Sequence, residues 1–347
     1  MSLTLLIIII ISCFIFDMIN GFHDAANSIA TVISTKVLTP FQAVCWAAFF
    51  NFVAFWVFDL KVADTVSKTV HPETINLVVI LSGVIAGIIW NLITWRFGIP
   101  SSSSHTLMGG FAGAAVAHAM NFNVVNSTVI GKTVLFIFLA PIIGIITGLF
   151  IAVIITNLFK RVNSYKADHI FRRFQLVTSA ALSLGHGGSD SQKVIGIIIA
   201  ALTVYNTYCL QHGIAVPGWL SHHDIHHVPE WIPISCYTVI GLGTLMGGMR
   251  IIKTMGTRIT KVTPFEGIAA ETAGAITLYG VSQGLGIPVS TTHTIAGSIM
   301  GVGMLKRISA VRWGITRQLL IAWIITIPIS GLIAAIVYWI MKLAGVY

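Results

Sequence analysis

The sequence predicts an all-α polytopic membrane protein, built as two inverted-topology repeats with broken helices and re-entrant hairpins. Three observations support this fold class: an apolar composition, a series of long apolar segments, and two motifs that recur in both halves. Of the 347 residues, 56% are hydrophobic and only 9% are charged, whereas a soluble globular protein carries about 25% charged residues. The composition therefore excludes a soluble enzyme, a disordered protein and a nucleic-acid-binding protein.

The N-terminal apolar run is interpreted as the first membrane span and not as a cleaved signal peptide. No basic segment precedes it, and no A-x-A cleavage site separates it from the charged residues Asp17 and Asp24. The four cysteines show no CxxC spacing and no disulfide framework. No cofactor is expected.

Ten apolar segments are candidates for the membrane elements, because a span requires about 20 apolar residues. In chain order they cover roughly residues 2–19, 40–58, 76–97, 105–120, 131–158, 175–205, 231–250, 265–283, 289–304 and 314–341. The fourth and the ninth are short for a full crossing, and each follows a Gly-x-Pro break. Each pair of segments around a break is therefore expected to form a re-entrant helical hairpin.

Basic residues decide the expected orientation, since loops rich in lysine and arginine face the cytoplasm. Three loops contain most of them: Lys160, Arg161, Lys166, Arg172 and Arg173 in the central loop, Arg250, Lys253, Arg258 and Lys261 in the next, and Lys306, Arg307, Arg312 and Arg317 in the last. The loops 59–75 and 206–230 hold few basic residues. The central basic loop is therefore expected in the cytoplasm, with both termini outside.

Two motifs recur in the same order in both halves of the chain. N-G-F-H-D-A-A-N-S-I-A (20–30) pairs with H-G-G-S-D-S-Q-K-V-I-G (186–196), and G-I-P-S-S-S-S-H-T (98–106) pairs with G-I-P-V-S-T-T-H-T (286–294). Each half has an odd number of crossings, so the second copy is expected to run upside down. Inverted repeats with broken helices are typical of secondary transporters. The expected units are a first repeat at 1–158, a cytoplasmic basic linker at 159–174 and a second repeat at 175–347.

The Gly-Ile-Pro breaks predict an anion site. Pro100 disfavours helix at the preceding residue and serine is a good N-cap, so a new helix is expected to start at Ser101 or Ser102. The first N–H groups of a helix carry partial positive charge and suit a tetrahedral oxyanion. The expected anion-binding residues are the hydroxyls of both copies: Ser101, Ser102, Ser103, Ser104, Ser290, Thr291 and Thr292. The competing interpretation, hydroxyls that only join transmembrane helices, is disfavoured by the duplication.

Acidic residues within the apolar segments predict cation coupling, because an ionised carboxylate is expensive in a membrane and usually functional. Asn27 follows Asp24 by three residues, on the same helix face, and offers oxygen ligands for Na⁺ or a partner for a protonated carboxyl. Lys193 stands at the same spacing after Asp190, where its ammonium can replace a bound cation. Asp17 shares this apolar setting. The competing interpretation is an inert ion pair inside the membrane.

The paired motifs resemble the inorganic phosphate transporter (PiT) family over nearly the whole chain. The family signature, G-x-N-D-x-x-N in each half, is matched at Asp24, Asn27 and Asp190. The sequence departs from the signature at His23 and Ser189, which precede the two aspartates, and at Lys193. These departures make it similar to the bacterial low-affinity, proton-coupled branch of the family.

The resemblance implies a secondary symporter that imports inorganic phosphate, driven by a proton or a sodium gradient, and not an enzyme. In this branch phosphate is expected to travel as a neutral complex with a divalent metal ion. The protein is expected among the lipids of the bacterial inner membrane, where it can form a homo-oligomer. A Na⁺ site that needs Asn in both copies is disfavoured by Lys193.

Histidines supply the remaining candidates. His23, His105 and His293 are candidates for a proton relay, although the two that follow the Ser/Thr runs are equally compatible with hydrogen bonds to the backbone. Weak candidates for ligands of a metal ion near the entrance are His222, His223, His226 and His227. A polar loop without function is the alternative for this cluster. Glu271 is expected to support the scaffold or to line the transport path.

Three other functions would use similar residues. A sulfate permease would also bind its anion with hydroxyls and helix ends, and only the resemblance favours phosphate. An anion channel would not require buried acidic residues beside its anion site. An intramembrane hydrolase would need one nucleophile and one base, whereas every serine run here is duplicated and neither G-x-S-x-G nor HExxH occurs.

Overall fold

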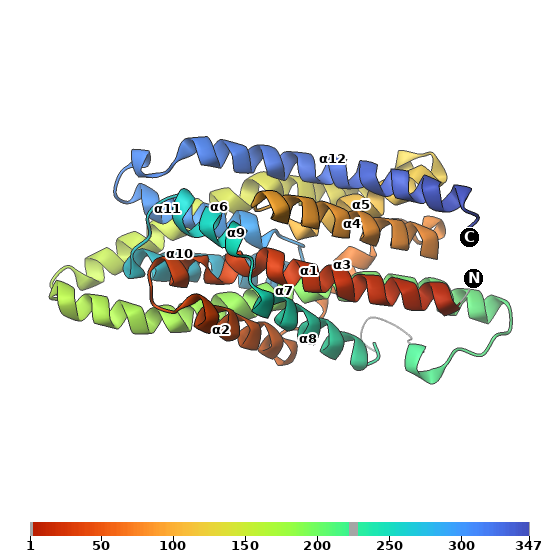
Figure 1. Cartoon of the computed structure of the whole chain (residues 1–347), viewed down its shortest axis with the longest axis horizontal. Helices are drawn as coiled ribbons and strands as arrows, with labels where there is room; N and C mark the ends of the chain where they lie inside the picture. Colours follow the sequence, from red (N-terminus) through yellow and green to blue (C-terminus); the bar gives the residue numbers. More distant parts are fainter. Residues whose placement is uncertain (1–2, 222–227, 347) are drawn as a thin grey trace.

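The computed structural model describes residues 3–221 and 228–346, which form an elongated bundle of helices (Figure 1). Throughout these two ranges the regular secondary structure is helical, without a β-strand. The first half contains α1 (Leu3–Ser34), α2 (Pro40–Val53), α3 (Lys61–Ser67), α4 (Leu77–Phe97), α5 (Ser103–Ala119) and α6 (Ser127–Phe159). The second half contains α7 (Ser164–Gln211), α8 (Trp231–Met246), α9 (Met249–Lys253), α10 (Pro264–Thr277), α11 (Thr291–Met304) and α12 (Trp313–Leu343).

The two halves repeat one order of elements. Each half has a long helix, a bent helix pair, two helices around a Gly-Ile-Pro break, and a long helix with an internal proline, Pro141 in α6 and Pro328 in α12. α10 continues as a π-helix over Leu278–Gly284. Each Gly-Ile-Pro break therefore follows a helix: α4 in the first half and this π-helix in the second.

The membrane-spanning character predicted from the sequence is confirmed. Within the described residues, five helices are long and apolar enough to cross a membrane: α1, α4, α6, α7 and α12. The bent pairs α2–α3 and α8–α9 turn by 85° and 65°, and each pair can count as one further span. α5 and α11 have only 17 and 14 residues, which is short for a full crossing of about 20 residues, as expected.

Two helices are longer than the sequence predicts. α1 continues to Ser34, so the first acidic motif lies inside this helix, where the helices around both breaks bind Asp24 and Asn27. α7 begins at Ser164, so most of the expected linker 159–174 is helical. Asn163 caps α7 by accepting the N–H of Tyr165 at 2.9 Å, and this cap stabilises a helix start that is too polar to be recognised by hydropathy.

The helices around each break pack against the last long helix of the opposite half. α5 lies along α12, and α11 lies along α6. Small residues permit this approach. A Cβ atom on Gly113 would overlap the backbone of Gly331, and one on Gly144 would overlap the backbone of Thr294. This exchange of contacts brings the two breaks into the interior of the bundle.

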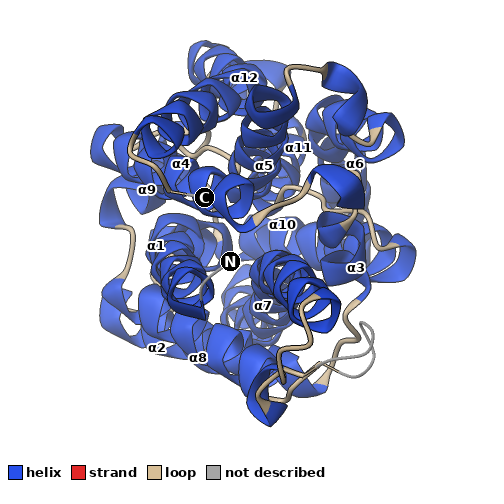
Figure 2. Ribbon diagram, turned by 90° about the vertical axis from the view of Figure 1, so that its right-hand side faces the viewer, coloured by secondary structure: helices blue, strands red, loops and turns tan. Residues whose placement is uncertain are grey.

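Viewed from one end, the helices form two groups (Figure 2). α1, α2, α7 and α8 contact one another on one side, and α4, α5, α6, α11 and α12 lie on the other, where α10 packs against α6 and α11. Contacts between α1 and α4 and between α7 and α10 join the groups. Large apolar side chains such as Phe150 on α6 and Leu332 on α12 remain exposed, which gives these helices a surface suited to lipid.

Candidate functional site

Both helix breaks are built in the same way. Gly98 and Gly286 have φ angles of +66° and +65°, a left-handed conformation that favours glycine at the end of a helix. Thr254 donates from its hydroxyl to the Gly98 carbonyl at 3.0 Å, and Thr65 donates to the Gly286 carbonyl at 2.7 Å. The bent pair of each half therefore holds the break of the other half.

A serine caps the helix that follows each break. Ser102 accepts the N–H of His105 at 3.3 Å, and Ser290 accepts the N–H of His293 at 3.3 Å. α5 thus begins at Ser103, with Ser102 as its cap, one or two residues after the predicted start at Ser101 or Ser102. The first N–H groups of both helices have no partner within the helix, and partial positive charge gathers there.

The two breaks meet in the interior of the bundle. The Thr292 hydroxyl donates to the Ser101 carbonyl at 3.1 Å. The centroids of the His105 and His293 rings are 4.9 Å apart, and Trp323 of α12 stacks on His293. All seven side chains predicted to bind phosphate are at most 3% exposed. The hydroxyl groups from both halves therefore surround one buried region.

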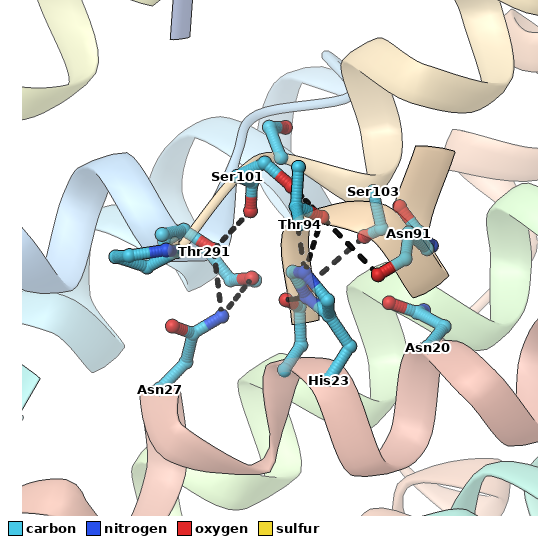
Figure 3. A network of polar contacts seen from close by, with 12 residues as sticks. Asn20, His23, Asn27, Asn91, Thr94, Ser101, Ser103 and Thr291 are labelled. Carbon is cyan, nitrogen blue, oxygen red and sulfur yellow. Dashed lines mark hydrogen bonds and ion pairs between the residues drawn. The ribbon is translucent and has the colours of Figure 1, made fainter. Parts of the chain in front are cut away.

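The first acidic motif points from α1 into the first break (Figure 3). Ser103 donates to Asp24 Oδ2 at 2.9 Å, and His23 Nδ1 lies 2.7 Å from Asp24 Oδ1. His23 Nε2 lies 3.0 Å from the hydroxyl of Thr94, which accepts a hydrogen bond from Ser101 at 2.9 Å. The carboxylate predicted to couple a cation thus contacts a hydroxyl predicted to bind phosphate.

Asn27 connects α1 to the second break. Its side-chain amide donates to the hydroxyl of Thr291 at 3.0 Å and to that of Thr292 at 2.9 Å (Figure 3). Its Oδ1 atom is buried and has no hydrogen-bond partner among the described residues. α1 therefore contacts the break of its own half through Asp24 and the break of the other half through Asn27.

The second acidic motif forms a buried ion pair on α7. Lys193 Nζ donates to Asp190 Oδ1 at 2.5 Å. Asn20 of α1 donates to Asp190 Oδ2 at 3.3 Å, and His186 Nε2 lies 3.4 Å from the same oxygen. All four residues are at most 2% exposed. The pair expected from the spacing of Asp190 and Lys193 is thus formed, and Asn20 links it to α1.

The aspartates of the two halves come together with a histidine. Asp24, His186 and Asp190 each offer one ligand atom, and these atoms lie within 4.8 Å of one another. Carboxylate oxygens and imidazole nitrogens are suitable ligands for divalent metal ions. Lys193 occupies one oxygen of Asp190, so a metal ion at this place would share that carboxylate with the ammonium.

Asn20 and His186 belong to the site, although the sequence interpretation did not single them out. Each precedes an aspartate by four residues, which is about one helical turn, so each side chain lies on the face of its aspartate. The signal was present in the alignment of the two motifs, where Asn20 and His186 occupy equivalent positions.

Thr94 was also missed. It contacts His23, the residue before Asp24, and lies four residues before the first break. In the second half Ser282 lies four residues before the break, and its hydroxyl is 3.0 Å from that of Ser189, the residue before Asp190. The same contact is therefore made twice, once in each half.

The remaining candidates from the sequence are Glu271 and the histidine cluster. Glu271 accepts hydrogen bonds from Thr31, Gln175 and Thr178, so it joins α10 to α1 and α7 and supports the scaffold. The weak metal-ligand candidates lie outside the described residues: His222, His223, His226 and His227.

Comparison with known proteins gives a family match, two similar relatives and a similar solved structure. Residues 20–334 match the Phosphate transporter family. The chain is 45% identical to a probable low-affinity inorganic phosphate transporter of Rhizobium meliloti (strain 1021), with 99% of both chains covered. It is 43% identical to a protein of the same description from Bacillus subtilis (strain 168), with 98% of both covered. A solved structure described as the sodium-dependent phosphate transporter shares the fold, with a TM-score of 0.79, 24% identity, and 98% of this chain and 100% of that chain covered.

The family match extends over both acidic motifs and both breaks, so it includes every element of the site. The relatives cover the chain from end to end and share the predicted transport function by description. This 347-residue chain is a multi-pass membrane protein that belongs to the phosphate transporter family, whose members are transporters and not enzymes.

Proposed function

We propose that this protein is a secondary symporter that imports inorganic phosphate across the bacterial plasma membrane together with a cation. The observation that carries the proposal is the 2.9 Å hydrogen bond from Ser103 to Asp24. It joins an acidic group of the first motif to a helix N-terminus that suits an anion. The descriptions of the relatives at 45% and 43% identity support phosphate rather than sulfate.

In this proposal phosphate is held by hydroxyl and N–H groups from both breaks. Ser102 and Ser290 use their oxygens as caps, which leaves their hydroxyl hydrogens for phosphate. Ser103 and Thr291 lie at the first helical positions of α5 and α11. Neutral donors bind phosphate less tightly than several arginines would, and a carrier must release its substrate.

Charge explains the proposed coupling. Phosphate beside Asp24 brings two negative groups together in a buried region, where their repulsion is stronger than in water. A proton or Na⁺ near Asp24 removes that repulsion, so the anion and the cation favour each other's binding. His23, with Nδ1 2.7 Å from the carboxylate, is a suitable proton carrier.

We infer that the driving ion is a proton. The Lys193 ammonium neutralises Asp190 at 2.5 Å, where a symmetric transporter would hold a second Na⁺. The alternative is Na⁺ bound by Asp24 and Asn27. The observation that favours it is the Asn27 Oδ1 atom, which is buried without a hydrogen-bond partner among the described residues.

A divalent metal ion is the proposed companion of phosphate. Asp24, His186 and Asp190 converge beside the first break, and they are of the chemical type that binds such ions. A metal–phosphate complex carries less charge than phosphate alone, which lowers the cost of passing it through a buried region.

We propose that the transporter consists of two inverted repeats. The repeated order of elements and the reciprocal contacts of Thr65 and Thr254 support it. The central basic loop lies in the cytoplasm and both termini lie outside in this arrangement, as the distribution of basic residues predicts.

Uptake of labelled phosphate into proteoliposomes tests the proposed function. We expect wild-type uptake to rise with an inward proton gradient, to collapse with a protonophore, and to resist competition by excess sulfate. Replacing Na⁺ with choline should leave it nearly unchanged. Uptake that is stimulated by Na⁺ and indifferent to the protonophore would instead support the sodium alternative.

A double variant, Ser103→Ala with Thr291→Ala, tests the binding groups. We expect saturable phosphate uptake to fall by more than tenfold, because Ser103 loses its hydrogen bond to Asp24 and Thr291 loses the hydroxyl that can donate to phosphate. Each hydrogen bond to a charged group is worth about 1.5–3 kcal/mol. Thr147→Ala is the matched control, since that hydroxyl bonds only to carbonyls of its own helix, Ile143 and Gly144. Unchanged phosphate binding in the double variant contradicts the assignment.

A further inference from the structure

Asp17 is a buried carboxyl that the proposed transport site does not use. It lies on α1 two helical turns before Asp24, about 10 Å away along the helix axis, and it is 0% exposed. It belongs to the buried face of α1, with Cys13 and Asn20 one turn away on either side. Neither of its oxygens has a hydrogen-bond partner among the described residues. An ionised carboxylate at this place would be uncompensated, which is unfavourable.

The groups around Asp17 provide no dedicated counter-charge. Among the described residues, the charged side chains that act on it are Asp190 and Lys193 of α7. Cys13 of α1 and Cys236 and Tyr237 of α8 are uncharged groups close enough to be affected by a charge on Asp17. Lys193 is already paired with Asp190 at 2.5 Å. α4, which also packs against α1, has no titratable side chain between Leu77 and Trp95. A proton on this carboxyl would therefore remove a charge that has no partner of its own.

These surroundings suit a proton and not a metal ion. Na⁺ and Mg²⁺ require several oxygen ligands, whereas the thiols of Cys13 and Cys236 are soft. A proton needs only one carboxylate oxygen and an acceptor for the resulting O–H. Asn20 Oδ1 lies one turn away on the same face and is buried without a partner among the described residues.

We propose that Asp17 is a proton-binding site that sets the charge of the coupling site, an inference that rests on the proposed phosphate symport. Asn20, one helical turn after Asp17 on α1, connects this part of the helix to the coupling site, because its amide donates to Asp190 Oδ2 at 3.3 Å. With a proton on Asp17, the group of Asp17, Asp190 and Lys193 is neutral. Loss of that proton leaves one negative charge, which opposes an anion at the breaks. Proton and phosphate therefore stabilise each other's binding.

Asp17→Asn keeps the size of the side chain and removes its titratable proton. The variant and the wild type are compared in proteoliposomes with an inward proton gradient, labelled phosphate and a trapped pH dye. We expect the ratio of protons to phosphate molecules entering to fall to half or less, because one carried proton is lost. Asp17→Glu should keep the wild-type ratio. Asp168→Asn is the control, since its ion pair with Arg172 is exposed.

The outcomes separate this inference from the function on which it rests. An unchanged ratio in Asp17→Asn overturns the inference. Phosphate uptake by the wild type without any proton entry overturns it too, while phosphate transport stands. Absence of phosphate transport in the wild type contradicts the proposed function instead. If Asp17→Asn does not fold, infrared spectroscopy of Asp17→Glu provides the second test. The band of the protonated acid must shift relative to wild type, and an unshifted band overturns the inference.

Discussion

At the scale of single residues, each acidic motif carries its own basic partner. Asp24 lies beside His23, and Asp190 lies beside Lys193. The two partners differ in kind, because the ring nitrogens of an imidazole can donate or accept a hydrogen bond, depending on the tautomer, whereas an ammonium only donates. In the proposed function, the Lys193 ammonium takes the place of a second bound cation, and His23 has no such role. This difference is the physical basis for preferring a proton as the driving ion.

Replacing Lys193 with Asn removes the fixed charge. We expect the free energy of unfolding to fall by about 3–5 kcal/mol, because Asp190 loses its buried partner. We also expect the proton dependence of phosphate uptake to weaken, since the new side chain matches Asn27 and can coordinate Na⁺ instead. Denaturation in detergent and uptake in proteoliposomes measure the two effects.

Lys68→Asn is the matched control for this substitution. The Lys68–Asp64 pair has a similar length, 2.7 Å, but both side chains are exposed, so its loss should change the free energy of unfolding by less than about 1 kcal/mol. The same proton dependence in Lys193→Asn as in wild type would show that the buried pair is structural only.

At the scale of elements, the two breaks depend on backbone geometry as much as on side chains. Gly98 and Gly286 turn the chain with positive φ angles, and a threonine from the opposite half binds each of their carbonyls. The helix that follows each break can then direct its N-terminus toward the same buried region. A small change in the turn would move that helix end and the hydroxyls on it.

Gly98→Ala tests this requirement. We expect a loss of about 1–2 kcal/mol in the free energy of unfolding, because an L-residue is strained in the left-handed conformation. Phosphate uptake should also fall, since α5 would shift. Gly131→Ala is the control, because that glycine lies in α6 with open space around it and alanine favours helix. Equal unfolding temperatures for the two variants would argue against strain at Gly98.

At the scale of the whole molecule, the two halves exchange contacts instead of folding side by side. α5 packs on α12, and α11 packs on α6. Asn27 of the first half reaches the second break, and Asn20 reaches Asp190. A motion of one half relative to the other would therefore change both breaks together, as alternating access requires.

Cysteine labelling tests the inverted topology. Asn121 and Ser309 are exposed and separated by 188 residues, the offset between the two break motifs. We expect Asn121→Cys to react with an impermeant maleimide in intact cells and Ser309→Cys to react only after permeabilisation, because inversion places them on opposite sides. Lys160→Cys, in the central loop, is the control for the cytoplasmic side. Labelling of Asn121→Cys and Ser309→Cys from one side would exclude inverted repeats.

Hydropathy and local stop signals were sufficient to predict the helical membrane fold, both breaks and their capping serines. These features depend on neighbours in the chain: an apolar run crosses a membrane, and Gly-Ile-Pro-Ser ends one helix and caps the next. The start of α7 at Ser164 was not predicted, because hydropathy reports transfer into lipid and not backbone conformation. A polar, basic segment can be a loop or a capped helix with the same hydropathy.

The partners within the site were decided by the tertiary structure. The sequence alone indicated that Asp24, Asn27, Asp190 and Lys193 were important, and the Asp190–Lys193 pair follows from their spacing on one helix. The sequence could not indicate that Asn27 binds Thr291, or that His186 lies beside both aspartates. Those contacts join residues on different helices. Their geometry depends on how whole helices cross, which small residues and breaks at distant positions determine together.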